Sequence, residues 1–440
     1  MTKCDLTLDI AIAGGGPAGA AAAAFLARAG YRVGLVTLPA TASRIEGMSP
    51  RVHAILQAND LPLAGVQPAT QRHVSWGEFQ GAQNVEHLVA RDEFDRALLD
   101  HLPGLGVTVW TGSIASVAVE TREIHLRDGR IMRARLLFEA RGRRAPNQTA
   151  SARQNRMGPD TISIAGFVES NGGEGSQILT RPRGWVWRAR LADGRLWQQV
   201  VTDSQAAAAR GPSRIAALWA HVMGAKAPLP QDPVVSACAL RLTAPRLDPR
   251  CPCLGDAAVA LDPLSGHGMF WAISSALMAP TMARAIFAGD VDLAREFYRN
   301  RVVDTFWRQA RVGRDFHAAS GETGPFWTRR RAWPDQAPAH PHVARPRLEP
   351  RVINRDGALT RDQVLVTTAE PSGAAFVMGQ PLAPIIHAIG PRALPDLSDF
   401  QQQIVPHLPP QQAAGLHHWL TTRGLANGPA IHVQRPEEYP

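Results

Sequence analysis

A short apolar strand that runs directly into a glycine turn and an alanine-rich helix constrains this chain most. Residues 9–13 are followed at once by Gly14-Gly15-Gly16-Pro17-Ala18-Gly19, and the helical pattern then reaches Arg28. In this spacing the first glycine allows the turn, the second lets the backbone approach a pyrophosphate, and the third lets helix and strand pack closely. The pattern predicts dinucleotide binding in preference to a merely structural glycine turn. The predicted contact residues are Gly14, Gly16, Pro17, Ala18 and Gly19.

The end of the second predicted strand departs from this pattern. Gly30 ends the helix and residues 31–36 form the next strand, after which an acidic residue normally binds the adenosine ribose. Thr37 stands at that place. We expect Thr37 to offer a hydrogen bond to a hydroxyl instead, and the pyrophosphate site does not depend on it.

Composition limits the class of protein. A chain of 440 residues should fold as two or three domains. The formal charge of +9 raises the question of nucleic acid, but Lys3 and Lys226 are the only lysines and the arginines are scattered. Glycines break the apolar run 8–29, and no other stretch approaches the roughly 20 apolar residues of a membrane span. We therefore expect a cytoplasmic protein without nucleic-acid or membrane partners.

Four cysteines are too few to staple a chain of this length and suit a reducing compartment. Cys251 and Cys253 flank a proline, which invites a metal interpretation. No Cys/His pair at ligand spacing accompanies them, so no metal site is predicted.

A second glycine-rich motif lies far downstream. Gly255-Asp256 leads into Asp262-Pro263-Leu264-Ser265-Gly266-His267-Gly268-Met269 and an apolar helix through Ile286. This resembles the second signature of flavoprotein monooxygenases and flavin-dependent halogenases. The resemblance implies FAD, with an aspartate on the ribityl chain and a helix N-terminus beside the isoalloxazine, where it can stabilise negative charge. The residues implied to bind FAD here are Gly255, Asp256, Pro263, Gly266, Gly268 and Met269.

Two segments between these motifs support the same resemblance. Residues 89–99 look like the family's helix whose leading arginine approaches the FAD phosphates, which implies Arg91, although a plain surface arginine is the alternative. Residues 136–143 resemble the strand and turn that close the FAD domain, with Glu139 and Arg141 in place of the usual aspartate and threonine. No second glycine fingerprint exists, so electrons should come from transiently bound NAD(P)H or from a flavin reductase.

The reaction is suggested by two aromatic residues and by a missing lysine. Gly184-Trp185-Val186-Trp187 is similar to the Trp-x-Trp element that lies near the substrate ring in the halogenase branch, which implies Trp185 and Trp187 as substrate residues; core packing is the alternative. Halogenases also need a lysine between flavin and substrate, and this chain has none from position 4 to 225. The resemblance therefore favours oxygen transfer from a flavin C4a-hydroperoxide to an aromatic ring.

His267 is the candidate catalytic residue. It lies in the turn expected to face the flavin, and an imidazole titrates in the range needed to move a proton of substrate or peroxide. The alternative is that only its backbone N–H matters.

These observations predict an α/β fold. A Rossmann-like FAD-binding domain should use residues 1–165 and 236–318, and a mixed or antiparallel substrate-binding sheet residues 166–235 with a contribution from 70–90. A Pro- and Arg-rich linker is expected over 319–345. A small domain, 346–440, should follow, with a hairpin-like pair at 364–367 and 374–378 and helices near 382–389, 397–405 and 410–422.

The C-terminal pattern resembles small winged-helix modules that bind precursor peptides. Residues 341–440 contain eight arginines and eight acidic residues, and the helix expected at 410–422 has no Lys or Arg. Such a surface suits a peptide better than DNA phosphates.

Together these features resemble the flavoproteins that hydroxylate a tryptophan of a partner subunit during tryptophylquinone biogenesis, as in maturation of quinohemoprotein amine dehydrogenase. The predicted partner is a peptide or small subunit that bears a tryptophan. Three alternatives stay open: a small-molecule phenol or indole hydroxylase, a flavin-dependent halogenase, and a redox-sensing winged-helix DNA-binding flavoprotein.

Overall fold

The computed structural model describes residues 8–38, 43–146, 157–169, 175–207, 211–390, 392–425 and 432–433; Lys3 lies outside them. The chain divides into two compact units, Met1–Gln336 and Ala337–Pro440. The mixed α/β fold expected from the sequence is confirmed.

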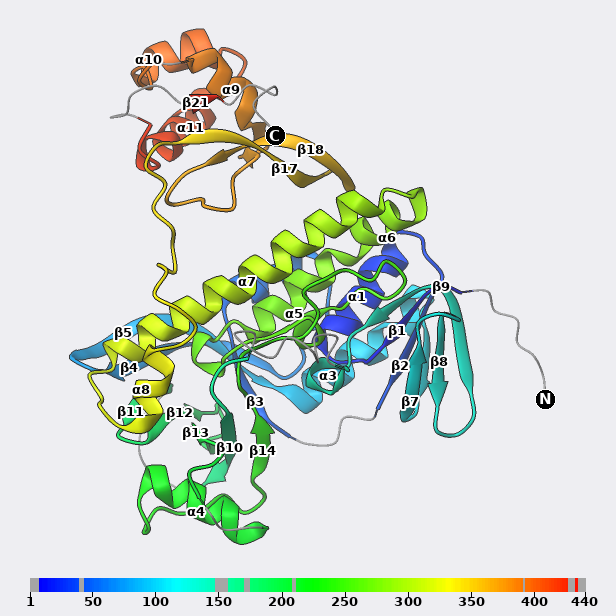
Figure 1. Ribbon diagram of the computed structural model, residues 1–440, viewed down its shortest axis with the longest axis vertical. Helices are drawn as coiled ribbons and strands as arrows, with labels where there is room; N and C mark the ends of the chain where they lie inside the picture. Colours follow the sequence, from blue (N-terminus) through cyan, green and yellow to red (C-terminus); the bar gives the residue numbers. More distant parts are fainter. Residues whose placement is uncertain are drawn as a thin grey trace. The chain divides into compact units, whose positions relative to one another are not determined.

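A six-stranded sheet forms the first layer of the larger unit (Figure 1). Its order is β6-β2-β1-β9-β8-β7; the first four strands are parallel, and β8 and β7 continue the sheet antiparallel to their neighbours. β1 lies inside the sheet, between β2 and β9, and every side chain in it except Asp9 is buried. The strands are β1 (Leu8–Ala13), β2 (Val33–Thr37), β6 (Thr108–Thr111), β7 (Ile114–Ala118), β8 (Glu123–Leu126) and β9 (Ile131–Glu139).

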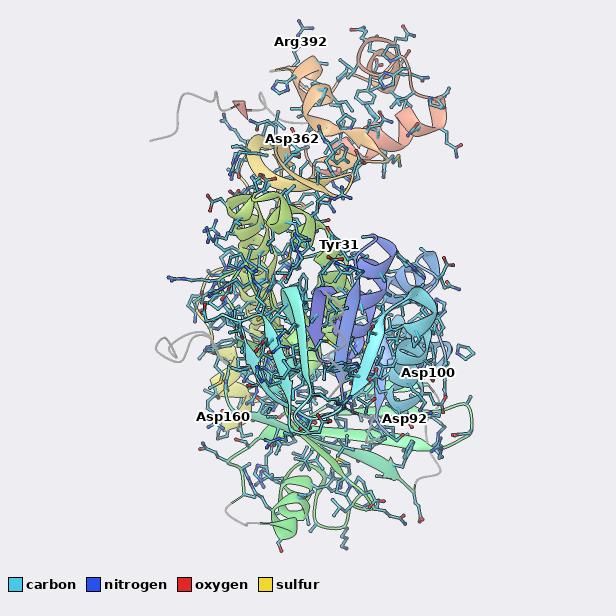
Figure 2. The ribbon with its side chains drawn as sticks, turned by 90° about the vertical axis from the view of Figure 1, so that its right-hand side faces the viewer. Tyr31, Asp92, Asp100, Asp160, Asp362 and Arg392 are labelled. Atoms are coloured by element: carbon cyan, nitrogen blue, oxygen red, sulfur yellow. The ribbon has the colours of Figure 1, made fainter. Side chains whose placement is uncertain are left out.

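Helices pack beside this sheet. In α1 the residues from Pro17 to Leu26 are all buried, and their alanine side chains let α1 approach both β2 and α5 closely. Tyr31, labelled in Figure 2, lies just after α1. Its ring centroid is 5.7 Å from that of Phe287 in α6. The helices are α1 (Pro17–Arg28), α2 (Pro50–Ala58), α3 (Arg91–His101), α5 (Gly268–Leu277), α6 (Ala279–Ala288) and α7 (Val291–Ala319).

The second sheet has eight strands in the order β14-β10-β13-β12-β11-β4-β5-β3. All its neighbours are antiparallel except β11 and β4, which are parallel. It extends beyond the segments expected from the sequence, because β3 and parts of β4, β10 and β14 lie outside them. The strands are β3 (Ile45–Met48), β4 (Val66–Trp76), β5 (Phe79–Ala90), β10 (Thr161–Val168), β11 (Ser176–Arg181), β12 (Gly184–Arg190), β13 (Leu196–Asp203) and β14 (Val234–Ala237).

Both faces of this sheet are buried at its centre. Val186 and Val200 point to one face, where Leu218 and Trp219 of α4 (Pro212–Met223) cover them. Trp185 and its neighbours on alternate positions point to the other face. Successive side chains of a strand point to opposite faces, so the alternation in 184–201 produces one covered face and one that is free to bound a cavity.

The predicted linker, 319–345, differs from the structure in its first half. Helix α8 (Pro325–Arg331) packs against the second sheet, where Trp327 is fully buried and donates its indole N–H to the Arg181 carbonyl oxygen at 3.0 Å. Arg330 is also buried and donates to an Asp203 carboxylate oxygen at 2.8 Å. The compact unit therefore continues to Gln336, because aromatic anchors bury a segment whose proline and arginine content is typical of a linker.

The smaller unit begins with a long hairpin that lies upstream of the hairpin-like pair expected from the sequence. Its two-residue turn is Asp356-Gly357, where both residues have positive φ values of 51° and 81°, as a type I′ turn requires. The pair expected at 364–367 and 374–378 is reduced to an isolated bridge between Leu365 and Ala374. The strands are β17 (Arg347–Arg355), β18 (Ala358–Val366), β19 (Phe376–Val377), β20 (Gln380–Pro381) and β21 (His432–Val433).

Three helical segments complete this unit close to their expected places. They are α9 (Leu382–Ile389), α10 (Leu397–Asp399) with a π-helical continuation to Ile404, and α11 (Pro410–Thr422). Leu382, Phe400 and Leu416 are fully buried, one from each segment, and they form a core with Leu365 of β18.

One stretch, Gly268–Ala288, is long and apolar enough to cross a membrane, contrary to the expectation that none would be. Of its apolar part, 56% is buried inside the protein. The stretch comprises α5 and α6, which pack against α1.

Candidate active site

A cavity of about 930 Å³ lies between the six-stranded and the eight-stranded sheets of the larger unit. The two glycine motifs, the arginine at the start of α3 and the tryptophans of β12 all reach it. The predicted residues that line it are Gly14, Gly16, Pro17, Ala18, Thr37, Arg91, Trp185, Trp187, Asp256, Pro263, Gly266, Gly268 and Met269. The volume is within the range of cofactor sites, which is about 300–1,000 Å³.

The first glycine motif has the geometry its sequence predicts. Gly14 has φ of 111°, and a Cβ added to it would meet the Ala140 carbonyl oxygen at 2.4 Å. A Cβ on Gly19 would meet the Gly14 carbonyl oxygen at 1.9 Å, so only glycine allows this approach of helix and turn. Gly16, in contrast, has nothing within 4 Å of such a Cβ and stands at the N-cap of α1. The open backbone at a helix N-terminus fits a pyrophosphate group.

The second motif meets the first in space. Gly255, in the short helix Gly255–Ala257, has φ of 55°, and a Cβ on it would lie 2.8 Å from the Cβ of Ala18. The backbone of Gly255 is fixed from behind, since its N–H donates to Ser275 Oγ at 2.9 Å and its carbonyl accepts from Trp271 Nε1 at 3.0 Å. Gly19 and Gly255 do not line the cavity themselves; they set the spacing of the elements that do.

Helix α5 brings its N-terminus to the cavity. Gly266 has φ of 61° and ends the turn Pro263–Ser265, whose Leu264 N–H is capped by the Asp262 carboxylate at 2.9 Å. Gly268 and Met269 begin the helix and line the cavity. The free N–H groups of such a first turn carry partial positive charge, which fits a flavin ring that becomes negative on reduction.

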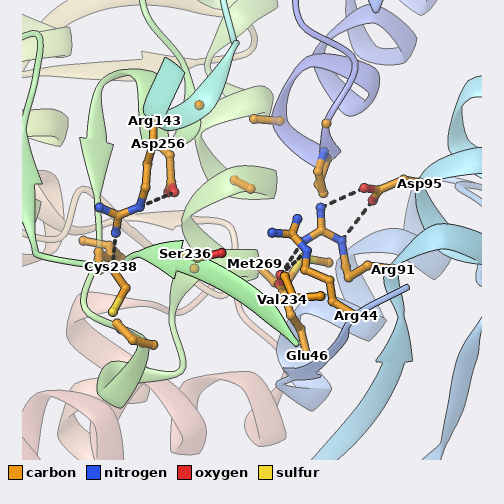
Figure 3. Close-up of a pocket in the computed structure, with 18 of the residues that line it drawn as sticks. Arg44, Glu46, Arg91, Asp95, Arg143, Val234, Ser236, Cys238, Asp256 and Met269 are labelled. Carbon is orange, nitrogen blue, oxygen red and sulfur yellow. Dashed lines mark hydrogen bonds and ion pairs between the residues drawn. The ribbon is translucent and has the colours of Figure 1, made fainter. Parts of the chain in front are cut away.

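Arg91 is held by two carboxylates, so it is not the surface arginine considered as the alternative (Figure 3). It donates to Glu46 Oε1 at 2.6 Å and to both Asp95 oxygens at 2.9 and 3.0 Å. Burial opposes its charge, but the two carboxylates outweigh that effect and raise the pKa of Arg91. The guanidinium is therefore always charged on the cavity wall.

Asp256 lies across the cavity from that cluster, 3.5 Å from the Arg143 guanidinium (Figure 3). Burial raises the pKa of Asp256, while the positive charge of Arg143 opposes the shift. Arg143 is itself fixed by the carbonyl oxygens of Ala239 and Leu261, at 2.6 and 3.0 Å. Glu139 and Arg141, which replace the usual residues of the closing turn, pair with each other.

Thr37 lines the cavity, and its hydroxyl already makes a hydrogen bond within the protein. Its Oγ1 donates to the Leu38 carbonyl oxygen at 3.0 Å and lies under Gly15, where a Cβ would come within 2.4 Å of it. The hydroxyl oxygen still has lone pairs with which to accept from a ribose hydroxyl.

One wall of the cavity is aromatic. Trp185, Trp187 and Trp197 are each at least 93% buried, and all three belong to the core of the second sheet and also line the cavity. Core packing and contact with a ligand are therefore both features of these residues. The indole nitrogen of Trp197 has no hydrogen-bond partner among the described residues.

Two charged residues of this wall were not predicted from the sequence. Glu86 of β5 and Arg72 of β4 line the cavity among the tryptophans, and their side chains lie 3.9 Å apart. A signal for Glu86 exists, because it stands two positions before the buried Leu88 and so shares its face of the strand. Nothing in the local pattern of β4 marks Arg72.

His267 is exposed, and its side chain is not among the residues that line the cavity. Its ring stands edge-on to Phe270 with centroids 6.3 Å apart, and its backbone N–H donates to Ser265 Oγ at 3.2 Å. Partial desolvation of the ring lowers its pKa despite the exposed surface of the residue, a backbone hydrogen bond at Ser265 opposes the shift, and the cations Arg308 and Arg72 add to it. Its catalytic role stays a prediction.

Two further groups bear on the chemistry. Burial raises the pKa of the Cys238 thiol to about 12, so this cavity-lining cysteine is neutral and no ready nucleophile. Among the described residues the only lysine is Lys226, which does not line the cavity. No group of three or more His, Cys, Asp or Glu in the described residues is arranged to hold a metal ion.

Comparisons with known proteins agree with this geometry. No family model matches the chain. The solved structure of QhpG, a peptidyl tryptophan dihydroxylase essential for tryptophylquinone cofactor biogenesis, is 33% identical, with a TM-score of 0.76 over 95% of this chain and 99% of that one. This chain belongs to the family of that dihydroxylase.

Two halogenases are also similar to this chain. The flavin-dependent halogenase CmlS shares the fold, with a TM-score of 0.68 and 17% identity over 98% of both chains. A tryptophan 2-halogenase of Chondromyces crocatus is 24% identical over 371 residues, which cover 72% of this chain and 70% of that protein. The protein is a flavin monooxygenase, and its cofactor is FAD.

Proposed function

We propose that this monooxygenase hydroxylates the indole ring of a tryptophan residue in a partner polypeptide, as a step in building a quinone cofactor. The observation that carries the proposal is the whole-chain similarity to QhpG, whose described role is peptidyl tryptophan dihydroxylation, together with the aromatic wall of the cavity. A small-molecule hydroxylase of phenols or indoles is the alternative with the same FAD site.

The two glycine motifs seat FAD between them in this proposal. Gly14, Gly16 and Gly19 shape the turn under the pyrophosphate, with Pro17 and Ala18 at the helix N-terminus above it. Arg91 adds a permanent positive charge near the phosphates, and Thr37 accepts from the ribose. Asp256 takes the ribityl hydroxyls, with Gly255 and Pro263 fixing the turns around it. FAD, once reduced, supplies the activation of O₂ and the transfer of one oxygen atom to the ring.

The chain's own residues hold the flavin ring and the substrate. The turn at Gly266 and the α5 N-terminus at Gly268 and Met269 would hold the flavin ring, and the wall with Trp185 and Trp187 would take the face of the substrate ring. Aromatic surface excludes water from the space between the two, which protects the oxidising species from hydrolysis. His267 acts from the rim of this space on a proton of the substrate.

The absence of a suitable lysine favours hydroxylation over halogenation. Arg72 is the cation that lies between the α5 turn and the tryptophan wall, since its guanidinium would be 3.4 Å from a Cβ on Gly266. A guanidinium stays protonated at all ordinary pH values, so it is no substitute for an amine that must bond to an oxidised halogen.

The unit Ala337–Pro440 docks the polypeptide that carries the tryptophan. We describe it as winged-helix-like, with β17 and β18 as the wing and α9 to α11 as the helices. Apart from the single bridge of Leu365 to Ala374, β18 is the outer strand of its sheet among the described residues, and Phe376 and Met378 are 39% and 56% exposed. An extended peptide adds to such an edge through backbone hydrogen bonds, with apolar side chains beside it.

The electron donor is NAD(P)H bound transiently or a separate flavin reductase. The described residues contain one strand–glycine turn–helix unit of the dinucleotide-binding kind, at β1 and α1, and FAD uses it.

Intact-mass analysis tests the function directly. The full chain with FAD, NADH, a flavin reductase and O₂ is incubated with tryptophan-bearing peptides from candidate partner subunits, in the presence of bromide. Addition of one or two oxygen atoms, labelled when ¹⁸O₂ is used, is the expected result. Bromine incorporation identifies a halogenase, and turnover of free indole with no reaction of any peptide identifies a small-molecule hydroxylase; either result contradicts the proposal.

A further inference from the structure

Glu86 is a buried carboxylate in the cavity that the proposed function leaves without a role. Only 6% of it is exposed, and it lines the cavity from β5 among the tryptophans. Its Oε1 accepts hydrogen bonds from the Ser176 hydroxyl and from the Trp187 indole nitrogen, the latter at 3.2 Å. A buried charge is costly unless its oxygens are fully paired.

The pairing of Glu86 is incomplete on the side of Oε2. The nearest cation, an Arg72 guanidinium nitrogen, lies 3.9 Å from Oε2, which is beyond hydrogen-bond distance. Arg72 Nε is buried and has no hydrogen-bond partner among the described residues. Oε2 of Glu86 therefore keeps unused hydrogen-bonding capacity on the cavity wall, which a bound molecule can satisfy.

The surroundings limit which molecule that is. Trp185 and Trp187 of β12 and Trp197 of β13 form an apolar wall that suits the face of an aromatic ring. A carboxylate accepts hydrogen bonds and cannot donate them. The site therefore suits an aromatic ring with an N–H donor in its plane, and an indole has that combination.

We propose that Glu86 binds the ring N–H of the substrate indole and acts as the base for that proton during hydroxylation; this rests on the proposed function. As a ring carbon forms its bond to oxygen, the ring loses electron density and the N–H proton moves to Glu86. The carbon's C–H bond then breaks, its electron pair restores the aromatic ring, its proton leaves through His267 to water, and Glu86 returns the first proton to nitrogen. One atom of O₂ ends in the new hydroxyl and the other in water, with two electrons from NAD(P)H through FAD.

Arg72 has a supporting position in this arrangement. It lies between Glu86 and the turn at Gly266, so its fixed charge stands at the boundary between the proposed cofactor and substrate regions. Ser176 and Trp187 hold the carboxylate in one rotamer from the other side.

Binding of indole and 1-methylindole to the FAD-loaded full chain tests the contact without any turnover. The methyl group removes the N–H and keeps the ring. We expect indole to bind at least about tenfold more tightly, because a hydrogen bond to a buried charge is lost with the analogue. In Glu86→Gln the preference should fall to about threefold or less. Equal affinities in the unmodified enzyme, or an undiminished preference in Glu86→Gln, overturn the proposal.

Ser176→Ala is the matched control, because it removes a partner of the same oxygen and leaves the carboxylate. It should retain the preference for indole, and the flavin absorption spectrum reports whether each variant has folded around FAD. Should Glu86→Gln fail to take up FAD, the comparison of the two indoles on the unmodified enzyme still decides the question.

Turnover separates this inference from the proposed function. With a tryptophan peptide that the enzyme hydroxylates, Glu86→Gln should lower the rate by about 100-fold. A 1-methyltryptophan version of that peptide should lower it similarly, and the two losses should not add. Full activity of Glu86→Gln on the peptide overturns the role of the base. Absence of peptide hydroxylation by an enzyme that still prefers indole overturns the proposed function and leaves the indole contact in place.

Discussion

Gly255 approaches Ala18 too closely to carry a side chain, although one belongs to the second glycine motif and the other to the first. A Cβ on Gly255 would lie 2.8 Å from the Ala18 Cβ, closer than real Cβ atoms approach. The contact joins the start of α1 to the Gly255–Ala257 turn, and it sets how far apart the pyrophosphate turn and Asp256 stand.

Gly255→Ala should therefore damage the FAD site. The new methyl group must displace α1, and the positive φ adds a strain of about 1–2 kcal/mol. We expect loss of bound flavin, measured by absorbance of the purified protein, and a lower melting temperature. Gly289→Ala is the control, since Gly289 has φ of 90° and open space; it should show the strain but retain flavin. Equal flavin content in both variants would contradict this reading.

Gly16→Ala should separate folding from cofactor binding. Nothing lies within 4 Å of the added Cβ and φ is −69°, so the free energy of unfolding without FAD should change by no more than about 1 kcal/mol. The methyl group points where the pyrophosphate is expected to lie, and FAD affinity should fall at least about tenfold. Gly104→Ala, equally open, is expected to leave the affinity unchanged. Tight FAD binding by Gly16→Ala would place the phosphates elsewhere.

Arg91→Met should be strongly destabilising. It leaves the Glu46 and Asp95 carboxylates without their shared partner, and breaking such a buried arrangement costs about 3–5 kcal/mol. Chemical denaturation of the FAD-free protein measures the loss. Arg32→Met removes an exposed partner of Asp9 and should change stability little. A similar loss in both variants would show that burial of Arg91 is not what matters.

We expect His317 to make the folded protein less stable in mild acid. The residue is 98% buried on α7, its Nδ1 donates to the Gly313 carbonyl, and its Nε2 has no partner in the described part of the chain. Burial lowers its pKa, the negative Asp262 opposes the shift, and the positive Arg330 and Arg331 add to it.

The sign follows from proton uptake. The unfolded state binds a proton at this residue below a pH of about 6.5 and the folded state only at lower pH, so stability falls as pH drops through that window. His317→Gln should reduce the slope of unfolding free energy against pH below about 6.5. The exposed His73, replaced in the same way, is the comparison. An unchanged slope in His317→Gln would assign the acid sensitivity to other groups.

Met378→Glu tests the proposed docking surface. Met378 is 56% exposed in the turn between β19 and β20, and a charge there should weaken binding of an apolar peptide by about tenfold. The readout is the affinity for a peptide that the enzyme hydroxylates. Leu229→Glu, at a residue 40% exposed in the larger unit, should leave that affinity intact. No effect of Met378→Glu would move the docking site elsewhere.

Local chemistry explains which elements could be read from the sequence. The spacing of Gly14, Gly16 and Gly19 predicts the glycine turn. Apolar periodicity between prolines and glycines predicts α9 and α11. The Asp356-Gly357 dipeptide favours a type I′ turn and so also indicates a hairpin, but the weak apolar alternation on either side of it does not mark the strands.

The sequence by itself determined the cofactor, since each of the two glycine motifs is complete within a few neighbouring residues. Only the tertiary structure decided what faces that cofactor. Glu86 and Ser176 come from β5 and β11, which lie on either side of β4, and β11 pairs with β4 in parallel across a long sequence separation. Such non-local pairing depends on how whole strands bury their apolar faces, so no local pattern could place Arg72, Glu86 and Trp187 on one cavity wall.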